Sequence, residues 1–174
     1  MARTEIWYLK RPEKLCTPAF AVYQTKTLSG KREQNDLINQ ACADLKAAAI
    51  AGYLIEFHSW PEQEAFKLSD TVSGFGKIAP FRKPKAALSE PLLHIHVLPV
   101  NYILDKHQHH ATSDACIVYT DFIVHNKRII LMIDYGSSHN GNMAEDIVQK
   151  YIDDFHILRP QLIEVVKRKL KKQQ

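Results

Sequence analysis

The alternation of hydrophobic and polar residues is clearest in the stretch LLHIHVLP, residues 92–99. Successive side chains of a β-strand point to opposite faces, so the pattern predicts a strand with aliphatic residues on one face and His94 and His96 on the other. At about 3.3 Å per residue, the two histidines would lie roughly 7 Å apart along the strand. We expect the aliphatic face to be buried and the histidine face to be exposed.

Periodic patterns elsewhere predict further strands and helices. Strands are expected at residues 20–27, 115–124 and 128–135, and the last two should form a hairpin. Helices are expected at residues 31–52 and from about Asn142 to Pro160.

Three features of the sequence refine this order of elements. Asn142 and Glu145 have capping-box spacing at the start of the second helix, and Pro160 should break that helix. Residues 57–90 carry few regular signals and should form a long loop. The order predicts an α+β fold, in which a small antiparallel sheet is packed by an N-terminal and a C-terminal helix.

Composition suits one ordinary globular domain. The chain has 174 residues, of which 45% are hydrophobic and 24% charged. No apolar run is long enough for a signal peptide or a membrane span, and the three cysteines are widely spaced, as reduced thiols usually are. We therefore expect a cytoplasmic protein with no membrane contact. The net charge of +4 permits a polyanionic partner without requiring one.

Cations and aromatic rings alternate in the second half of the predicted loop. The residues concerned are Phe75, Lys77, Phe81, Arg82, Lys83 and Lys85. Such a pattern matches single-stranded nucleic acid, because phosphates meet the charges and bases stack on the rings. The alternative is a basic loop that is only solvated. The basic C-terminal end of the chain likewise either contacts RNA phosphates or is a solvated helix end.

Other histidines bear on whether the chain holds a metal ion. His107, His109 and His110 lie in a polar segment, but no carboxylate or cysteine stands beside them at ligand spacing. A solvent-exposed loop is therefore favoured over a metal site shared with the central strand. His139 lies in the turn cluster GSSHNG after the last predicted strand.

These pieces, in this order, resemble the YafO family of toxins from bacterial toxin–antitoxin pairs, which belong with the RelE-type mRNA interferases. The matching stretches are AVYQTKTL, FGKIAPF, LLHIHVLP, TSDACIVYT, KRIILMIDY and HNGNMAEDIVQKYIDDF. The resemblance implies a single domain with its core at about residues 20–156, an N-terminal extension at 1–19 and a basic helical tail at 157–174. The sequence departs from the family at Lys77 and Ile78, where an arginine and an aspartate are expected. Lysine keeps the positive charge but cannot bind a phosphate through two parallel hydrogen bonds, as the arginine guanidinium does.

The resemblance also implies a function. A protein of this kind is a RelE-like endoribonuclease that needs no metal or cofactor, cuts mRNA, usually on the ribosome, and is held inactive by a cognate antitoxin. Cleavage by the RNA's own 2′-hydroxyl requires a base for that hydroxyl, an acid for the 5′-oxygen and cations for the charge that develops at phosphorus.

Candidate residues follow from these three requirements. His94 and His96 are the candidates for base and acid, in either order, and Lys77 and Arg82 for the cations. His139 is a third proton-transfer candidate. Substrate binding is expected from Lys83, Lys85, Phe75, Phe81 and Tyr119.

Other readings of the same residues stay open. HIHVLP resembles the end of the motif of histidine-triad nucleotide hydrolases, with Leu92 in place of the first histidine; His94 would then be the nucleophile. A non-catalytic module that binds nucleic acid or the ribosome would also use the cations and rings.

Overall fold

The computed structural model describes residues 17–54, 56, 74–102, 111–137 and 143–173. Its five strands form one sheet in the order β1-β5-β4-β3-β2. The elements are β1 (Ala21–Gln24), α1 (Lys26–Gln34), α2 (Asp36–Ala51), β2 (Phe75–Pro80), the 3₁₀ helix η2 (Lys85–Ser89), β3 (Leu92–Val97), β4 (Ala115–Val124), β5 (Lys127–Ser137) and α3 (Glu145–Lys171).

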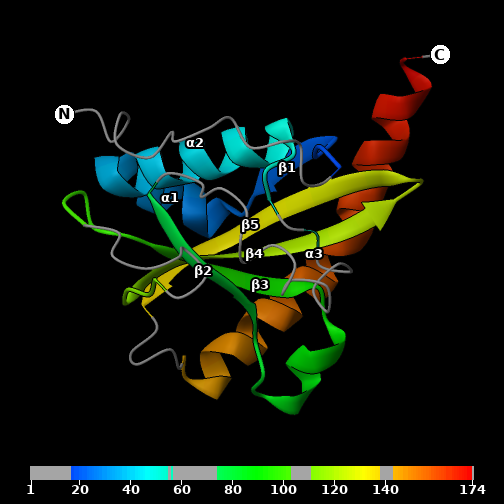
Figure 1. Cartoon of the computed structure of the whole chain (residues 1–174). Coiled ribbons are helices and arrows are strands. Elements are labelled where there is room, and N and C mark those ends of the chain that lie inside the picture. Colours follow the sequence, from blue (N-terminus) through cyan, green and yellow to red (C-terminus); the bar gives the residue numbers. More distant parts are fainter. Residues whose placement is uncertain (1–16, 55, 57–73, 103–110, 138–142, 174) are drawn as a thin grey trace.

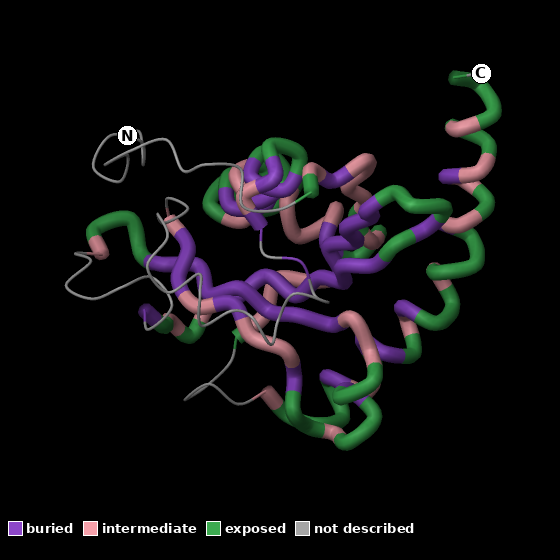
Figure 2. The backbone as a smooth tube through the Cα atoms, turned by 45° about the vertical axis from the view of Figure 1, so that its right-hand side comes forward, coloured by how far each residue is buried: buried purple, intermediate pink, exposed green. Residues whose placement is uncertain are grey.

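Helices cover both faces of the sheet, with α1 and α2 on one face and α3 on the other (Figure 1). The first core, under α1 and α2, includes Leu28, Leu45, Phe75, Leu93, Ile95, Ile117, Tyr119 and Met132. The second core, under α3, includes Phe81, Leu92, Cys116, Val118, Ile129, Ile133, Tyr151 and Phe155. The buried residues follow the central strands, whereas the C-terminal half of α3 is largely exposed (Figure 2).

The predicted α+β class and the hairpin are confirmed. β4 and β5 pair in antiparallel register from Ala115↔Ser137 to Val124↔Lys127. Their turn places His125 and Asn126 at positive φ, 47° and 60°, which is the backbone geometry of a tight hairpin turn. The sheet is mixed rather than wholly antiparallel, because β1 pairs with β5 in parallel.

Two predicted N-terminal elements have different bounds. The strand expected at residues 20–27 ends at Gln24, since Thr25 accepts a hydrogen bond from the Leu28 amide and starts α1. The helix expected at residues 31–52 is two helices, because Asn35 is extended and its side chain caps α2. Gly52 ends α2 in the left-handed conformation, as the sequence indicated.

The expected long loop contains regular structure in its described part. Residues 75–80 form β2, which pairs with β3 at the edge of the sheet, and residues 85–89 form η2. Pro80 is tolerated because it stands at the end of an edge strand.

The predicted break at Pro160 is wrong. α3 runs without interruption from Glu145 to Lys171. It continues because buried residues on both sides of the proline, Phe155 and Leu162, pack in the second core. The helix starts after Ala144, which provides no side-chain cap, and Asn142 lies outside the described residues. None of the described helices has the length and hydropathy that a membrane span requires.

Candidate active site

His94 and His96 lie together on the face of β3 that α3 covers. They alternate with Leu93, Ile95 and Val97, which belong to the first core. The ring centroids are 5.3 Å apart and the rings meet edge to face, at 76°. The predicted placement of the two rings on one face is therefore confirmed.

The expected exposure of this histidine pair is wrong. Side chains of His94 and His96 are 8% and 1% exposed. β3 lies between β2 and β4, all six of its residues are buried, and Leu92 on the histidine face belongs to the second core. When both faces of a strand are covered, neither face is exposed to solvent.

Burial makes both rings weak bases. Desolvation, with smaller contributions from His96 and Lys77, lowers the pKa of His94 to about 4. Desolvation also lowers the pKa of His96, and Lys77 adds to it, whereas the hydrogen bond to Ser113 and the charge of Asp114 act in the opposite direction. Both rings are therefore neutral near pH 7, and neither holds the extra proton that a general acid gives up.

Hydrogen bonding distinguishes the two nitrogens of His96. Nδ1 lies 2.6 Å from the main-chain oxygen of Ser113, and a carbonyl can only accept, so Nδ1 carries the hydrogen. The Ser113 amide also donates to Nδ1, at 3.3 Å, and this contact by itself would favour the hydrogen on Nε2. We assign the hydrogen to Nδ1 because the contact with the carbonyl is the shorter of the two. Nε2 of the neutral ring is then unprotonated and has the protonation state of a base, although the residue is only 1% exposed.

His94 differs from His96 in having an unsatisfied nitrogen. Its Nδ1 is buried and has no hydrogen-bond partner. The ring packs against Phe81, with centroids 4.7 Å apart. A buried polar atom without a partner costs about 1–3 kcal/mol. Among the described residues, the side-chain hydroxyls of Tyr23 and Thr120 are in the same situation.

The predicted cations differ in their closeness to the pair. Lys77, half-buried in β2, is near enough to both rings to lower their pKa values. Arg82, Lys83 and Lys85 are exposed and follow Phe81, the residue that covers His94. We call these three exposed residues the basic segment. His139 lies outside the described residues.

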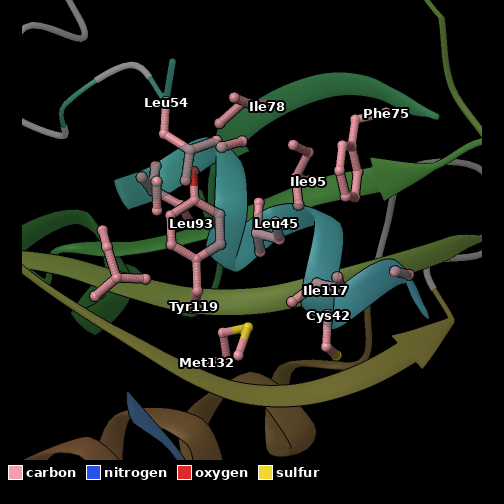
Figure 3. Close-up of a cluster of buried hydrophobic side chains, with 14 of the residues drawn as sticks. Cys42, Leu45, Leu54, Phe75, Ile78, Leu93, Ile95, Ile117, Tyr119 and Met132 are labelled. Carbon is pink, nitrogen blue, oxygen red and sulfur yellow. The ribbon is translucent and has the colours of Figure 1, made fainter. Parts of the chain in front are cut away.

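Two of the predicted substrate-binding rings are in the first core, on the opposite face of the sheet. Phe75 and Tyr119 are 2% and 0% exposed and pack among aliphatic side chains under α2 (Figure 3). A ring must present a free face to stack on a base. Core packing therefore accounts for both residues. Phe81 is the predicted aromatic beside the histidine pair, and it too is buried, at 6% exposed, in the second core.

Sequence reasoning missed the role of Ser113. It lies 17 residues from His96 along the chain, and only the pairing of β3 with β4 brings the two together. The signal in the sequence is slight: a serine two residues before a strand.

A second polar cluster lies further along the same sheet. Lys31 Nζ is 2.7 Å from Asp134 Oδ1, and the Tyr151 hydroxyl donates to Asp134 Oδ2 at 3.0 Å. Burial and the Asp134 carboxylate raise the pKa of Tyr151. These mutually satisfied groups tie α1, β5 and α3 together, and we interpret them as structural.

No group of three metal-ligating side chains is assembled among the residues that the structure describes. His107, His109 and His110 were considered as ligands of a metal site shared with the central strand. They lie outside the described residues.

Comparison with protein families gives one match. The model described as "Toxin YafO, type II toxin-antitoxin system" matches residues 59–161. That range contains β2, β3, the β4–β5 hairpin and the first part of α3, and with them Lys77, the histidine pair and Ser113. Searches of curated proteins and of solved structures produced no significant match.

Proposed function

The chain belongs to the YafO family of toxins from type II toxin–antitoxin systems, and on this premise we propose that it is an endoribonuclease that cleaves mRNA and stops translation. The observation that carries the proposal is His96: its Nδ1 is held by a carbonyl, so its Nε2 is left as a free base beside a second imidazole and a lysine. As a type II toxin, the protein has a cognate antitoxin as its partner. Its targets are mRNA and the ribosome, in the cytoplasm.

The proposed reaction uses the RNA's own 2′-hydroxyl. Nε2 of His96 takes the proton from this hydroxyl as its oxygen attacks the neighbouring phosphorus. The bond from phosphorus to the 5′-oxygen breaks, which leaves a 2′,3′-cyclic phosphate and a free 5′-hydroxyl. Lys77 stabilises the charge on the phosphorane oxygens.

The acid in this reaction is not His94. With its pKa at about 4, His94 is unprotonated near neutral pH. We assign it to holding the orientation of the His96 ring through their edge-to-face contact. Lys77 is then the proton donor for the 5′-oxygen, and His139 is the second candidate.

The basic segment supplies the approach path for RNA in this proposal. Arg82, Lys83 and Lys85 are exposed and directly follow Phe81, whose ring lies on His94. An RNA strand held by these cations would run beside that ring. Movement of the Phe81 side chain would then open the histidine pair to a phosphate.

The proposal is tested by inducing expression in a bacterial host and mapping mRNA 5′ ends. Wild type should arrest growth and create new internal mRNA ends. His96→Asn should abolish both, with cleavage by purified protein reduced by at least about 100-fold, because the base is missing. Asparagine suits the test since its amide nitrogen can replace Nδ1 as donor to the Ser113 carbonyl, which keeps that hydrogen bond.

The matched control is His156→Ala, which removes an exposed histidine of α3 that pairs with Glu90. It should remain toxic and cleave RNA normally. A His96→Asn protein that is folded by circular dichroism and still creates mRNA ends would overturn the assignment of the base. Growth arrest without new ends in wild type would instead identify a toxin that binds without cutting, and hydrolysis of adenosine phosphoramidates would identify a nucleotide hydrolase.

A further inference from the structure

We infer that Ser113 is a positioning residue for His96: its carbonyl selects the imidazole tautomer, and its hydroxyl holds that carbonyl in place. The catalytic importance of this role rests on the proposed ribonuclease function, but the effect on the His96 tautomer does not.

The hydroxyl of Ser113 is anchored where β3 ends and β4 begins. Oγ lies 2.7 Å from the main-chain oxygen of Val97 and 2.9 Å from that of Ala115. Val97 directly follows His96 in β3, and Ala115 is the first residue of β4. The hydroxyl hydrogen is therefore shared between two carbonyls whose positions are set by the sheet, and Ser113 has little freedom to turn its own carbonyl away from His96.

A second anchor fixes the same segment on the other side. The Lys77 amide donates to the Ala111 carbonyl at 2.7 Å, so the segment at residues 111–113 is tied to β2 as well. Gly76 makes this approach possible, because a Cβ there would lie 2.2 Å from the Ala111 oxygen. The main chain that carries the Lys77 side chain and the main chain that orients His96 are thus joined through one short segment.

The consequence for His96 is a choice between two neutral forms. With the hydrogen on Nδ1, Nε2 can accept a proton; with the hydrogen on Nε2, the ring can only donate there. The carbonyl 2.6 Å from Nδ1 favours the first form, whereas the Ser113 amide, which donates to Nδ1 at 3.3 Å, favours the second; the shorter contact decides for the first. Enzymes that use histidine as a base commonly orient it in this way, through a hydrogen bond to the nitrogen that does not react.

The test compares Ser113→Ala with wild type in two independent measurements. In ¹⁵N NMR spectra of histidine-labelled protein, wild type should show His96 with its hydrogen on Nδ1, and Ser113→Ala should show a mixture of tautomers. Cleavage of a model RNA should fall by about tenfold, the lower end of the effect expected when a supporting hydrogen bond is lost. The acid limb of the pH–rate profile should move to lower pH, because the hydrogen bond that raises the pKa of His96 is weakened.

Two further variants make the result specific. Ser113→Thr keeps a hydroxyl and should restore the wild-type tautomer and profile. Thr112→Ala removes the hydroxyl of the exposed neighbouring residue and should change neither.

Three outcomes decide between the positioning role and the ribonuclease function. If Ser113→Ala leaves both the His96 nitrogen signals and the acid limb unchanged, the positioning role is wrong. If the tautomer shifts in Ser113→Ala but even wild type fails to cut RNA, the positioning role stands and the ribonuclease function falls. If Ser113→Thr behaves like Ser113→Ala, the hydroxyl is not the anchor and this inference is overturned.

Discussion

His94 shows at the scale of one residue how burial changes chemistry. The alternation in LLHIHVLP places this ring beside that of His96 on one face of β3, as the sequence predicted. The pKa of about 4, however, comes from the second core around it, which no local pattern announces. Within the proposed ribonuclease function, we therefore keep His96 as the candidate base and no longer propose His94 as the acid.

Stability should depend on pH through His94. The unfolded chain protonates this ring at pH 6.5, the folded protein only at about 4, so the unfolded state binds more protons between these values. The contribution of neutral His94 to the free energy of unfolding should be greatest above pH 6.5. It should decrease by roughly 3 kcal/mol as the pH falls to 4. Urea unfolding at about pH 7.5 and about pH 4.5 measures the difference.

A His94→Gln variant has no ring to titrate and should lose most of this pH dependence. His156→Ala, which removes an exposed histidine, should keep it. Equal pH dependence in wild type and His94→Gln would show that other groups cause the acid destabilisation.

At the scale of elements, α3 shows tertiary packing overriding a local signal. Pro160 lacks the amide hydrogen that an interior helical position donates, and sequence reasoning expects a break there. Apolar residues on both sides, from Val148 to Val166, lie on the stripe that packs in the second core. Breaking the helix would expose part of that stripe, so the helix continues at the cost of a missing hydrogen bond.

Replacing this proline should stabilise the protein. Pro160 is exposed, so Pro160→Ala removes no buried contact. We expect a gain of about 2 kcal/mol: the helical penalty of proline is about 3 kcal/mol, less about 1 kcal/mol because alanine leaves the unfolded chain more flexible. Urea denaturation at neutral pH measures the gain, and Gln161→Ala at the next exposed position should change stability by well under that amount. A loss of stability would mean that a bend at Pro160 is needed to lay α3 on the sheet.

At the scale of the whole molecule, two groups of exposed cations lie at opposite edges of the sheet in the described part of the chain. The basic segment is next to β2, at one edge of the sheet. The basic end of α3 is beside β1, at the other edge, where Lys169 lies 4.8 Å from the centre of the Tyr23 ring. Only the first group adjoins the histidine pair.

RNA binding should therefore depend on the basic segment. Replacing Arg82, Lys83 and Lys85 by glutamine should weaken binding of a short single-stranded RNA and reduce the slope of log affinity against log salt concentration by about 2, as expected for three lost phosphate contacts. Fluorescence anisotropy over a series of salt concentrations measures this slope. The matched control replaces the same number of exposed cations at the end of α3: Arg168, Lys171 and Lys172. Equal losses in the two triple variants would contradict a path through the basic segment.

The sequence by itself determined the features that depend on near neighbours. Side-chain alternation placed the two histidines on one face of a strand, and the patterns around residues 125–126 determined the hairpin. These features follow from backbone geometry over a few residues, so a local pattern is enough to specify them.

Only the tertiary structure decided what surrounds those features. The burial of the histidine face, the parallel pairing of β1 with β5, and the contact of Ser113 with His96 all join segments far apart in the chain. No local periodicity records which segment covers a strand's second face or which carbonyl meets a ring nitrogen. The physical reason is that desolvation and tautomer choice depend on the atoms that surround a side chain in space, and the folded chain alone sets those neighbours.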